Sequence, residues 1–484
     1  MTANDTQRPL HIAFLNPQGN FDPADSYWTA HPDFGGQLVY VKEVALGLGR
    51  QGHRVDIVTR HIVDPDWLPF AATEDHYPDA PNVRILRVPC GPQGFVAKEA
   101  LWPHLREWVA NIAALYEREG AWPDVCTGHY ADGGVAAAAL QVSQAIPFTF
   151  TGHSLGAQKR DRLLETKPEG AAELEARYHF AERLEAERVA MHRAGAVITN
   201  SGQEQREQYA HPVYVGAVDP EDQAHFAVIP PGANLTIFDK GSRSPREDEI
   251  RAVVAARWER DIAPERQHLP AIIASMRLDP KKNHIGLVKA FLGSPELREQ
   301  ANLLLIIRGS DHPLRDWAGA SADEQALLKA MNEAITAGDG WGSVTSFALA
   351  GQDAIAATFR WASASKGVFC LPALYEPFGL GVIEAMVAGL PVVATSFGGP
   401  QEISDGGRAV LLADPTNEPE LAAQLLRLIG DAALWQEYAD AGYQRVLDRY
   451  TWERTAASYA SVAYALLRGE RRGGDALPLP AWIA

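Results

Sequence analysis

One stretch of the sequence decides the fold: residues Tyr375–Ala385, which read Tyr-Glu-Pro-Phe-Gly-Leu-Gly-Val-Ile-Glu-Ala. An apolar run precedes it and an amphipathic helical pattern follows, so the glycines lie where a strand turns into a helix. The N–H groups of Gly379–Gly381 would then lack partners inside the helix and could bind a phosphate. Glu376 precedes the turn and Glu384 lies about one helical turn inside it, where carboxylates could accept hydrogen bonds from sugar hydroxyls.

Length and charge limit the kinds of protein that this chain can be. Its 484 residues exceed what one hydrophobic core holds, so about two or three domains are expected. The formal net charge is −17, and the acidic residues are spread along the chain. This balance argues against nucleic acid or an anionic membrane as a partner. A phosphate-bearing substrate must therefore be held by local cations.

Cysteine usage and hydropathy indicate a cytoplasmic protein. Cys90, Cys126 and Cys370 have neither metal-ligand nor Cys-x-x-Cys spacing, so we expect neither a zinc site nor a disulfide framework. Residues Met1–Leu10 are polar and contain no apolar targeting segment. No later run approaches the roughly 18 apolar residues that span a bilayer, so no membrane partner is expected.

The first half of the chain alternates strand and helix patterns. Short β-branched runs predict strands at residues 10–15, 55–59, 83–88, 146–151 and 197–199. The loop 16–37 ends in a second pair of glycines, and helical spacing then runs from Leu38 to Leu48. At these glycines a plain helix start and a close backbone approach to a phosphate or sugar fit the residues equally well.

The second half repeats this architecture after a break. The Pro- and Gly-containing residues 229–234 and the polar stretch 239–268 predict a hinge. Further strands are predicted at residues 271–276, 303–307, 344–349, 367–371 and 391–395. The pattern predicts an α/β fold of two doubly wound, Rossmann-like domains facing a deep central cleft, where ligands bind at the carboxyl ends of the strands.

The expected domains are an N-terminal domain at residues 1–235, a C-terminal domain at residues 236–455, and a C-terminal helix and tail at residues 456–484. Within the first domain, Glu169–His192 is rich in Glu and Arg and predicts one long helix with a solvated face. The end of the chain, Gly473–Ala484, is punctuated by Gly and Pro and is expected to be loosely ordered.

Cationic residues follow the first predicted strand of the second half. Arg277 and Lys282 come after residues 271–276, where they could neutralise a diphosphate leaving group, Arg through its planar fork and Lys as a point charge. No Asp-x-Asp pair stands out as a set of metal ligands. Fixed cations and helix N-termini would then replace a divalent ion.

The first half offers weaker candidates. His153 lies just beyond the strand 146–151, where a structural role and a hydrogen bond to a sugar hydroxyl fit equally well. No helical pattern requires Lys98, Lys159 or Arg183. Most such residues are solvated surface, so these three are weak candidates. The sequence contains no Ser-His-Asp order, reactive cysteine or Walker lysine, so hydrolase and kinase chemistry lack a nucleophile or a P-loop.

Together, these motifs resemble the retaining GT-B glycosyltransferases of family 4 and, within that family, the sucrose-phosphate synthases. The similarity extends from about Ile12 to Thr455, nearly the whole chain. The motifs that carry it are Asn16–Gly19, Phe34–Tyr40, Gly128–Asp132, Thr151–Gly156, Val228–Gly232, Arg277–Asn283 and Tyr375–Leu380, with Glu384.

The resemblance implies transfer of glucose from UDP-glucose to fructose 6-phosphate, giving sucrose 6-phosphate and UDP without a metal or other cofactor. It implies catalytic roles for His153, Arg277, Lys282 and Glu376. The donor contacts that it implies are Gly36, Phe378, Gly379, Leu380 and Glu384. The acceptor contacts that it implies are Gly35, Gln37, Lys98, Lys159 and Arg183. The sequence has no recognisable phosphatase domain, so a separate sucrose-phosphate phosphatase is expected to act downstream.

One departure leaves the acceptor open. Glu182 stands beside Arg183 where these enzymes usually carry a second arginine, and a carboxylate beside a phosphate is unfavourable. Tyr178-His179-Phe180 is more similar to the sucrose synthases, which use free fructose. The residues also leave room for a different donor, such as ADP-glucose or, as in mannosylfructose-phosphate synthases, GDP-mannose. A GT-B epimerase without an acceptor and a non-catalytic protein that binds sugar nucleotides are two further hypotheses.

Overall fold

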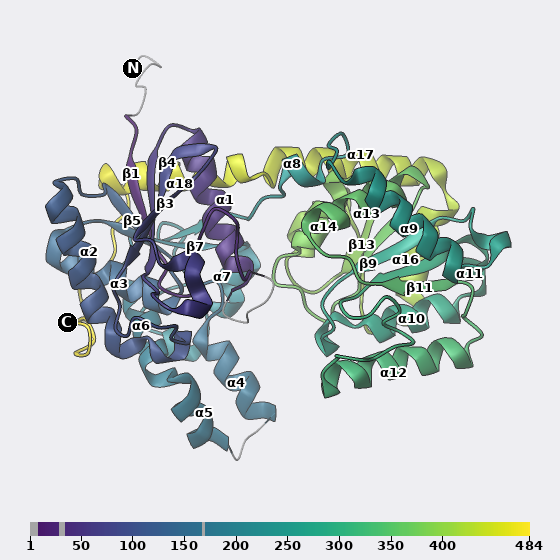
Figure 1. The fold of residues 1–484 in the computed structure, drawn as a ribbon, viewed down its shortest axis with the longest axis horizontal. Coiled ribbons are helices and arrows are strands. Elements are labelled where there is room, and N and C mark those ends of the chain that lie inside the picture. Colours follow the sequence, from purple (N-terminus) through teal and green to yellow (C-terminus); the bar gives the residue numbers. More distant parts are fainter. Residues whose placement is uncertain (1–7, 29–33, 167–169) are drawn as a thin grey trace. The chain divides into compact units, whose positions relative to one another are not determined.

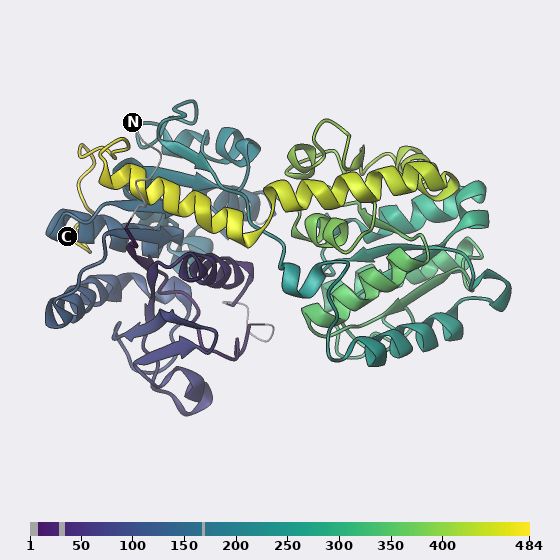
Figure 2. The same cartoon turned by 90° about the horizontal axis from the view of Figure 1, so that it is seen from above.

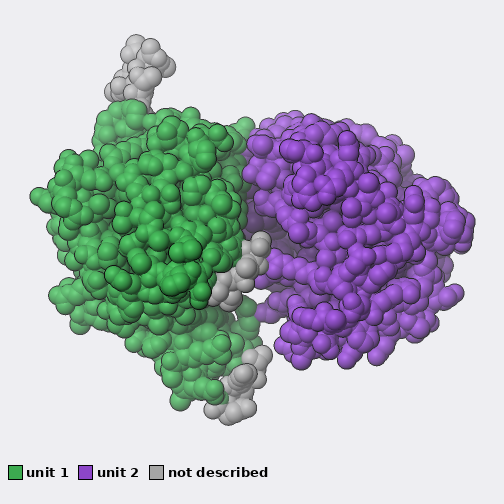
Figure 3. All heavy atoms as spheres, in the orientation of Figure 1, with its two compact units in different colours: residues 1–230, 452–484 green, residues 231–451 purple. Residues whose placement is uncertain are grey.

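The chain folds into two compact units, each built around its own sheet. The computed structural model describes residues 8–28, 34–166 and 170–484. The first unit comprises residues 1–230 and 452–484, and the second comprises residues 231–451 (Figure 3). The division thus falls after residue 230, where the sequence suggested residue 235. The C-terminal segment belongs to the first unit because its helix packs there.

The described part of the first unit contains an eight-stranded sheet in the order β3-β4-β2-β1-β5-β6-β7-β8. Strand β3 runs antiparallel to β4, and the other neighbours pair in parallel. The strands are β1 (His11–Leu15), β2 (Arg54–Arg60), β3 (Glu74–Tyr77), β4 (Ala80–Val88), β5 (Val125–His129), β6 (Phe148–Thr151), β7 (Ala196–Thr199) and β8 (Phe226–Val228). The helices are α1 (Gly36–Arg50), α2 (Leu105–Glu119), α3 (Tyr130–Gln144), α4 (Gly156–Thr166), α5 (Ala171–Tyr178), α6 (Phe180–Arg193), α7 (Gly202–Gln208) and α18 (Trp452–Leu467).

Alternate residues of each central strand bury on opposite faces of this sheet. In β1, Ala13 and Leu15 pack against α2, α3 and α6, whereas Ile12 and Phe14 pack against α1 and α18. Helices α1 and α18 lie side by side on this second face (Figure 1, Figure 2). A parallel sheet covered on both faces is the doubly wound arrangement.

The described part of the second unit has a six-stranded, all-parallel sheet in the order β11-β10-β9-β12-β13-β14. The strands are β9 (Ala271–Ser275), β10 (Asn302–Ile306), β11 (Val344–Phe347), β12 (Val368–Leu371), β13 (Val392–Thr395) and β14 (Leu411–Ala413). The helices are α8 (Leu235–Phe238), α9 (Glu247–Asp261), α10 (His284–Gly293), α11 (Pro295–Gln300), α12 (Ala322–Ala337), α13 (Gln352–Ala364), α14 (Leu380–Val387), α15 (Pro400–Ile403), α16 (Glu418–Gly430) and α17 (Ala432–Arg449). Figure 1 shows α9 and α13 on one face of the sheet and α10 and α12 on the other.

The expectation of two doubly wound α/β domains is confirmed. Each strand predicted from an apolar run exists, with ends shifted by a few residues. The short strands β3, β5, β8 and β14 were not predicted. Strands β3 and β5 have few consecutive apolar residues, whereas β8 and β14 lie in the short apolar runs 226–229 and 409–413, which the prediction missed. Residues Met1–Gln7, part of the loop 16–37 (residues 29–33), and Glu169 lie outside the described residues.

The sequence suggested that the polar stretch 239–268 is part of a hinge, but the structure has a helix there. Half of the stretch forms α9, whose Ile250, Val254 and Trp258 are buried in the core of the second unit. Their spacing of four residues places them on one side of the helix. The exposed charged residues lie toward the two ends of the helix, at Asp248, Glu249, Glu259 and Arg260, and conceal the apolar stripe from a reading by composition.

Two further expectations in the first unit are wrong. The long helix expected up to His192 is broken at His179, which adopts a left-handed conformation with φ 50° between α5 and α6. The tail after residue 473 is packed rather than loose. Ile483 is buried, and the Trp482 ring lies edge-on to Trp102 with centroids 5.7 Å apart. The Arg193 guanidinium also donates to a tail carbonyl, that of Leu477, at 2.8 Å.

Candidate active site

The glycine turn of the second unit connects β12 to α14. Gly379 precedes the helix with φ 109°, a conformation that favours glycine. The N–H groups of Val382 and Ile383 donate to the Gly379 carbonyl. Within the described part of the chain, the N–H groups of Leu380 and Gly381 have no acceptor. The turn therefore offers an anion two backbone donors at the positive end of a helix.

A second glycine pair, Gly398 and Gly399, supports this turn from the loop after β13. The N–H of Gly399 donates to the Glu376 carbonyl at 2.8 Å, and the N–H of Glu376 donates to the Phe397 carbonyl at 3.1 Å. A Cβ on Gly398 would lie 2.0 Å from the Glu376 carbonyl oxygen, and one on Gly399 would lie 2.4 Å from the Phe378 backbone. Side chains at these two positions would displace the turn.

The second unit also brings Lys282 and Glu376 together. Their Nζ and Oε2 atoms lie 2.6 Å apart, and the two side chains are 21% and 13% exposed. Lys282 ends a short 3₁₀ helix, Pro280–Lys282, that Asp279 caps by accepting from the Lys281 N–H. Because β9 and β12 are neighbours in the sheet, the loops that follow them meet at the same sheet edge. The site is therefore a paired cation and carboxylate at the strand ends.

The side chains of Arg277 and Glu384 have no hydrogen bond or ion pair with another described residue. Arg277 is exposed directly after β9. Glu384 is partly buried in α14, and this burial raises the pKa of its carboxyl to about 7. An unpaired carboxyl with a raised pKa inside a site is typical of a group that binds a ligand.

In the first unit, Gly35 and Gly36 begin α1. Neither has a positive φ, and a Cβ built on either would meet no described residue within 4 Å. Neither backbone strain nor packing among the described residues therefore requires glycine here. Gln37 is buried, and its Nε2 donates to Asn16 Oδ1 at 2.7 Å. This bond ties the start of α1 to the loop after β1.

His153 follows β6 and has φ 54°. Its Nε2 lies 2.8 Å from Nδ1 of His129, a fully buried residue whose Nε2 lies 3.2 Å from Thr127 Oγ1. Burial lowers the pKa of His153 to about 3, so its imidazole is neutral at physiological pH. His153 can therefore orient a hydroxyl but does not supply a positive charge.

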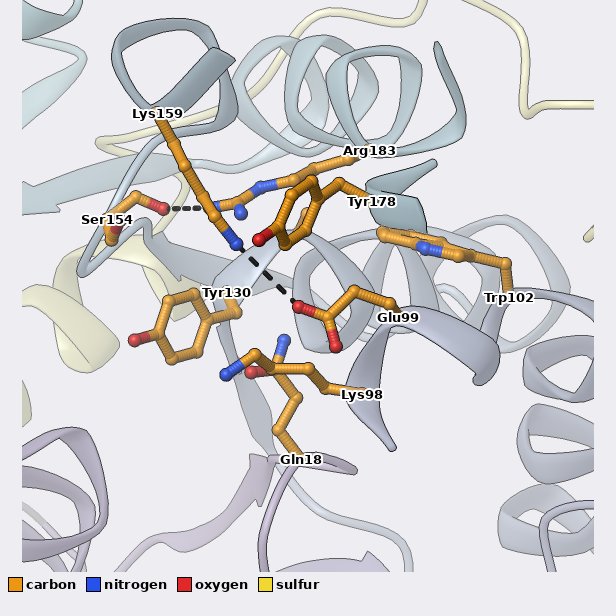
Figure 4. Close-up of a pocket in the computed structure, with 10 residues that line it drawn as sticks. Gln18, Lys98, Glu99, Trp102, Tyr130, Ser154, Lys159, Tyr178 and Arg183 are labelled. Carbon is orange, nitrogen blue, oxygen red and sulfur yellow. Dashed lines mark hydrogen bonds and ion pairs between the residues drawn. The ribbon is translucent and has the colours of Figure 1, made fainter. Parts of the chain in front are cut away.

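The structure brings the three basic candidates of the first unit into one cavity of about 200 Å³, here called the basic pocket (Figure 4). Lys159 comes from α4, Arg183 from α6, and Lys98 from the short 3₁₀ helix Lys98–Ala100. Figure 4 shows Lys159 and Arg183 reaching in from one side and Lys98 from the other. The remaining lining residues are Gln18, Glu99, Trp102, Tyr130, Ala131, Ser154 and Tyr178.

The carboxylate inside this pocket is Glu99, not Glu182. The Oε1 atom of Glu99 lies 3.6 Å from Lys159 Nζ, which also lies 4.1 Å from the centroid of the Tyr178 ring. Burial and the neighbouring Arg183 lower the pKa of Lys159. Glu182 does not line the pocket, and its carboxylate lies 3.9 Å from His179 Nδ1.

Sequence reasoning missed several residues of these sites. The pair Gly398-Gly399 had a signal, because it follows a predicted strand as the other glycine turns do. His129 also had one, because it lies in the motif Gly128–Asp132. Glu99 and Trp102 had none, since only the folded chain brings them into the pocket with Lys159.

The described residues contain neither a cluster of metal ligands nor a membrane-spanning helix. No group of three or more His, Cys, Asp or Glu side chains among them could hold a metal ion. No helix in the described ranges is long and apolar enough to cross a membrane.

The fold and the sites define a class of protein. One doubly wound domain carries a cation and two backbone donors at a helix start, and the other carries a basic pocket. This combination defines a GT-B glycosyltransferase. The family described as "Glycosyl transferases group 1" matches residues 258–445, and "Glycosyl transferase 4-like domain" matches residues 35–231.

Individual relatives narrow this class. A probable sucrose-phosphate synthase of Thermosipho melanesiensis is 39% identical over 94% of this chain and 96% of its own length. The sucrose-phosphate synthase of Zea mays is 33% identical over 97% of this chain, which spans only 48% of that longer protein. The solved structure of a sucrose-phosphate synthase from Thermosynechococcus elongatus has a TM-score of 0.67 at 24% identity, covering 95% of this chain and 100% of that one. The chain belongs to the sucrose-phosphate synthase family.

Proposed function

We propose that the protein transfers glucose from UDP-glucose to fructose 6-phosphate, giving sucrose 6-phosphate and UDP. The observation that carries this proposal is the basic pocket, where Lys98, Lys159 and Arg183 converge within an acidic protein. Three cations in a cavity of about 200 Å³ suit a sugar phosphate better than a neutral sugar. The 39% identity to a probable sucrose-phosphate synthase supports the same acceptor.

The second unit would hold the donor. Its diphosphate would take the N–H groups of Leu380 and Gly381 together with Arg277 and Lys282, and Glu384 would accept from the ribose hydroxyls. Glu376, the backbone from Phe378 to Leu380, and His153 would orient the glucosyl hydroxyls. The ion pair between Lys282 and Glu376 is already formed at 2.6 Å, so the ammonium is held in place before the diphosphate arrives.

The first unit would hold the acceptor close to the backbone of Gly35 and near Gln37. The space around Gly35 and Gly36 supports a close approach by a ligand, because neither strain nor packing against the described residues accounts for the missing side chains. We place Gly36 on the donor side and Gly35 and Gln37 on the acceptor side.

We propose that transfer retains the glucosyl configuration and needs no metal. The bond between the anomeric carbon and the UDP oxygen breaks, and the acceptor hydroxyl forms its bond on the same face of the ring. The proton of that hydroxyl passes to the departing phosphate. Arg277 and Lys282 stabilise the charge that develops on UDP, which is the largest contribution that such a site can make. A separate sucrose-phosphate phosphatase would then consume the product.

The decisive experiment measures UDP release from UDP-glucose with fructose 6-phosphate, with free fructose and with no acceptor, and identifies the products by mass. Release that depends on fructose 6-phosphate supports the proposal. Release that depends on free fructose instead refutes the phosphorylated acceptor and points to a sucrose-synthase reaction. A changed donor sugar without acceptor would identify an epimerase. The same assay with ADP-glucose and GDP-mannose tests the nucleotide.

A further inference from the structure

A buried carboxylate, Glu187, lies behind the basic pocket without lining it. It is 1% exposed and comes from α6, one helical turn after Arg183. Its Oε1 accepts from Arg183 Nε at 3.0 Å, and its Oε2 accepts from the Tyr214 hydroxyl at 2.5 Å. Both oxygens accept from the N–H of Gly156, the first residue of α4, at 2.8 and 3.0 Å. Three donors therefore converge on one carboxylate that has little contact with water.

These bonds link two of the three cations that line the pocket, Arg183 and Lys159. The other end of the Arg183 guanidinium donates to the Ser154 carbonyl at 2.5 Å, so the group is fixed at two points. Gly156 begins the helix whose first turn carries Lys159. We propose that Glu187 is the positioning residue of the basic pocket: it fixes Arg183 directly and Lys159 through the start of α4, and so sets the affinity for the acceptor's phosphate. This inference rests on the proposed function for the identity of the phosphate.

Gly156 shows how tightly this arrangement is packed. A Cβ on Gly156 would lie 3.0 Å from both Cδ and Nε of Arg183, so the arginine side chain passes directly over the glycine. Glycine is needed here for space, because the residue has no positive φ. The substitution Gly156→Ala should therefore shift Arg183 while leaving the Glu187 carboxylate in place.

The substitution Glu187→Gln separates positioning from charge, because the two effects have opposite signs. If the carboxylate acted only through its charge, its removal would make the pocket more positive and phosphate would bind more tightly. If it positions the cations, glutamine weakens binding. Its amide NH₂ can face only the Tyr214 hydroxyl, which must then accept instead of donate, and its oxygen holds the Arg183 guanidinium without the charge that strengthens that bond. We expect weaker phosphate binding, by about tenfold or more, the loss typical of a disrupted charged hydrogen bond.

The experiment uses the full chain with Glu187→Gln, Gly156→Ala and a matched control, Glu185→Gln. Glu185 lies on the same helix, is exposed, and accepts from Trp482 Nε1, a bond that glutamine can keep. Calorimetric titration with inorganic phosphate gives the affinity of the pocket, and UDP release gives KM for fructose 6-phosphate, KM for UDP-glucose and kcat. Thermal unfolding of each variant is recorded alongside.

The inference predicts that Glu187→Gln and Gly156→Ala weaken phosphate binding and raise KM for fructose 6-phosphate, while KM for UDP-glucose stays at the control value. Phosphate binding by Glu187→Gln that equals or exceeds that of the control overturns the inference. If Glu187→Gln does not fold, Gly156→Ala decides, and unchanged phosphate affinity there overturns it. A wild-type protein that does not turn over fructose 6-phosphate refutes the proposed function instead, and the phosphate titration still tests Glu187.

Discussion

Replacement of Lys282 by alanine tests the proposed reaction at its most charged step. The ammonium lies 2.6 Å from the Glu376 carboxylate, and the two side chains are 21% and 13% exposed. At such low exposure, water can do little to replace the missing charge when UDP departs. The substitution also leaves the Glu376 carboxylate without its cation, facing the diphosphate.

The size of the effect follows from this geometry. Removing one preorganised group that stabilises developing charge lowers kcat by about 10² to 10³, or about 3 to 4 kcal/mol in activation free energy. We expect a loss in this range for Lys282→Ala, mainly in kcat, because the charge on UDP is larger in the transition state than in the bound donor.

The assay is UDP release at saturating UDP-glucose and fructose 6-phosphate, with Lys281→Ala as the matched control. Lys281 is the preceding residue, is exposed, and contributes its backbone carbonyl to the Leu374 N–H, a bond that alanine keeps. Both variants lose one positive charge from the same 3₁₀ helix. Equal activity of the two variants, with unchanged thermal unfolding, would refute the assignment of Lys282 to the leaving group.

Four more outcomes are expected. Gly36→Ala should leave thermal unfolding unchanged, because its Cβ meets nothing within 4 Å, yet lower transfer by about a hundredfold if a ligand approaches the backbone; unchanged transfer would contradict this. KM for UDP-glucose should rise as the pH falls through about 7, the pKa of Glu384, because the protonated carboxyl accepts fewer hydrogen bonds from ribose; Glu384→Gln should abolish that dependence. Activity should be unchanged after dialysis against EDTA. A loss of activity that Mg²⁺ reverses would refute metal independence. Glu247→Ala should lower the free energy of unfolding in urea by about 3 to 5 kcal/mol, because it removes the carboxylate that pairs with buried Arg360, whereas the exposed control Glu249→Ala should cost about 0 to 1 kcal/mol.

The sequence predicted the fold and the loops that carry the candidate site because both depend on local pattern. Apolar runs interrupted by glycine mark strands that end at a sheet edge, and the residues after them, such as Lys282 and Glu376, lie at that edge in the structure. Parallel α/β sheets place ligands there, so position along the chain is enough to nominate candidates.

What the sequence could not predict depends on contacts between distant segments. Glu187 is one of several glutamates in α6 and has no local feature that marks it as buried. Its role arises only because Gly156 and Tyr214 come to it from other elements. Trp482 likewise looks like part of a loose tail until the fold places it on Trp102. Helix α9 was missed for a different reason, since its outward charges outnumber the three apolar residues that it buries.

An acidic protein that binds phosphates must prevent its own carboxylates from neutralising its cations permanently. Here three of the proposed phosphate partners are already paired: Lys159 with Glu99, Lys282 with Glu376, and Arg183 with Glu187. The carboxylates differ in exposure, at 24%, 13% and 1% respectively. A more exposed carboxylate can return to water when phosphate arrives, because its solvation is easily recovered, whereas Glu187 would remain unsolvated without its partners. We infer that Glu99 releases Lys159 when substrate competes for it, whereas Glu376 keeps Lys282 in place and Glu187 stays bound to Arg183 throughout the reaction.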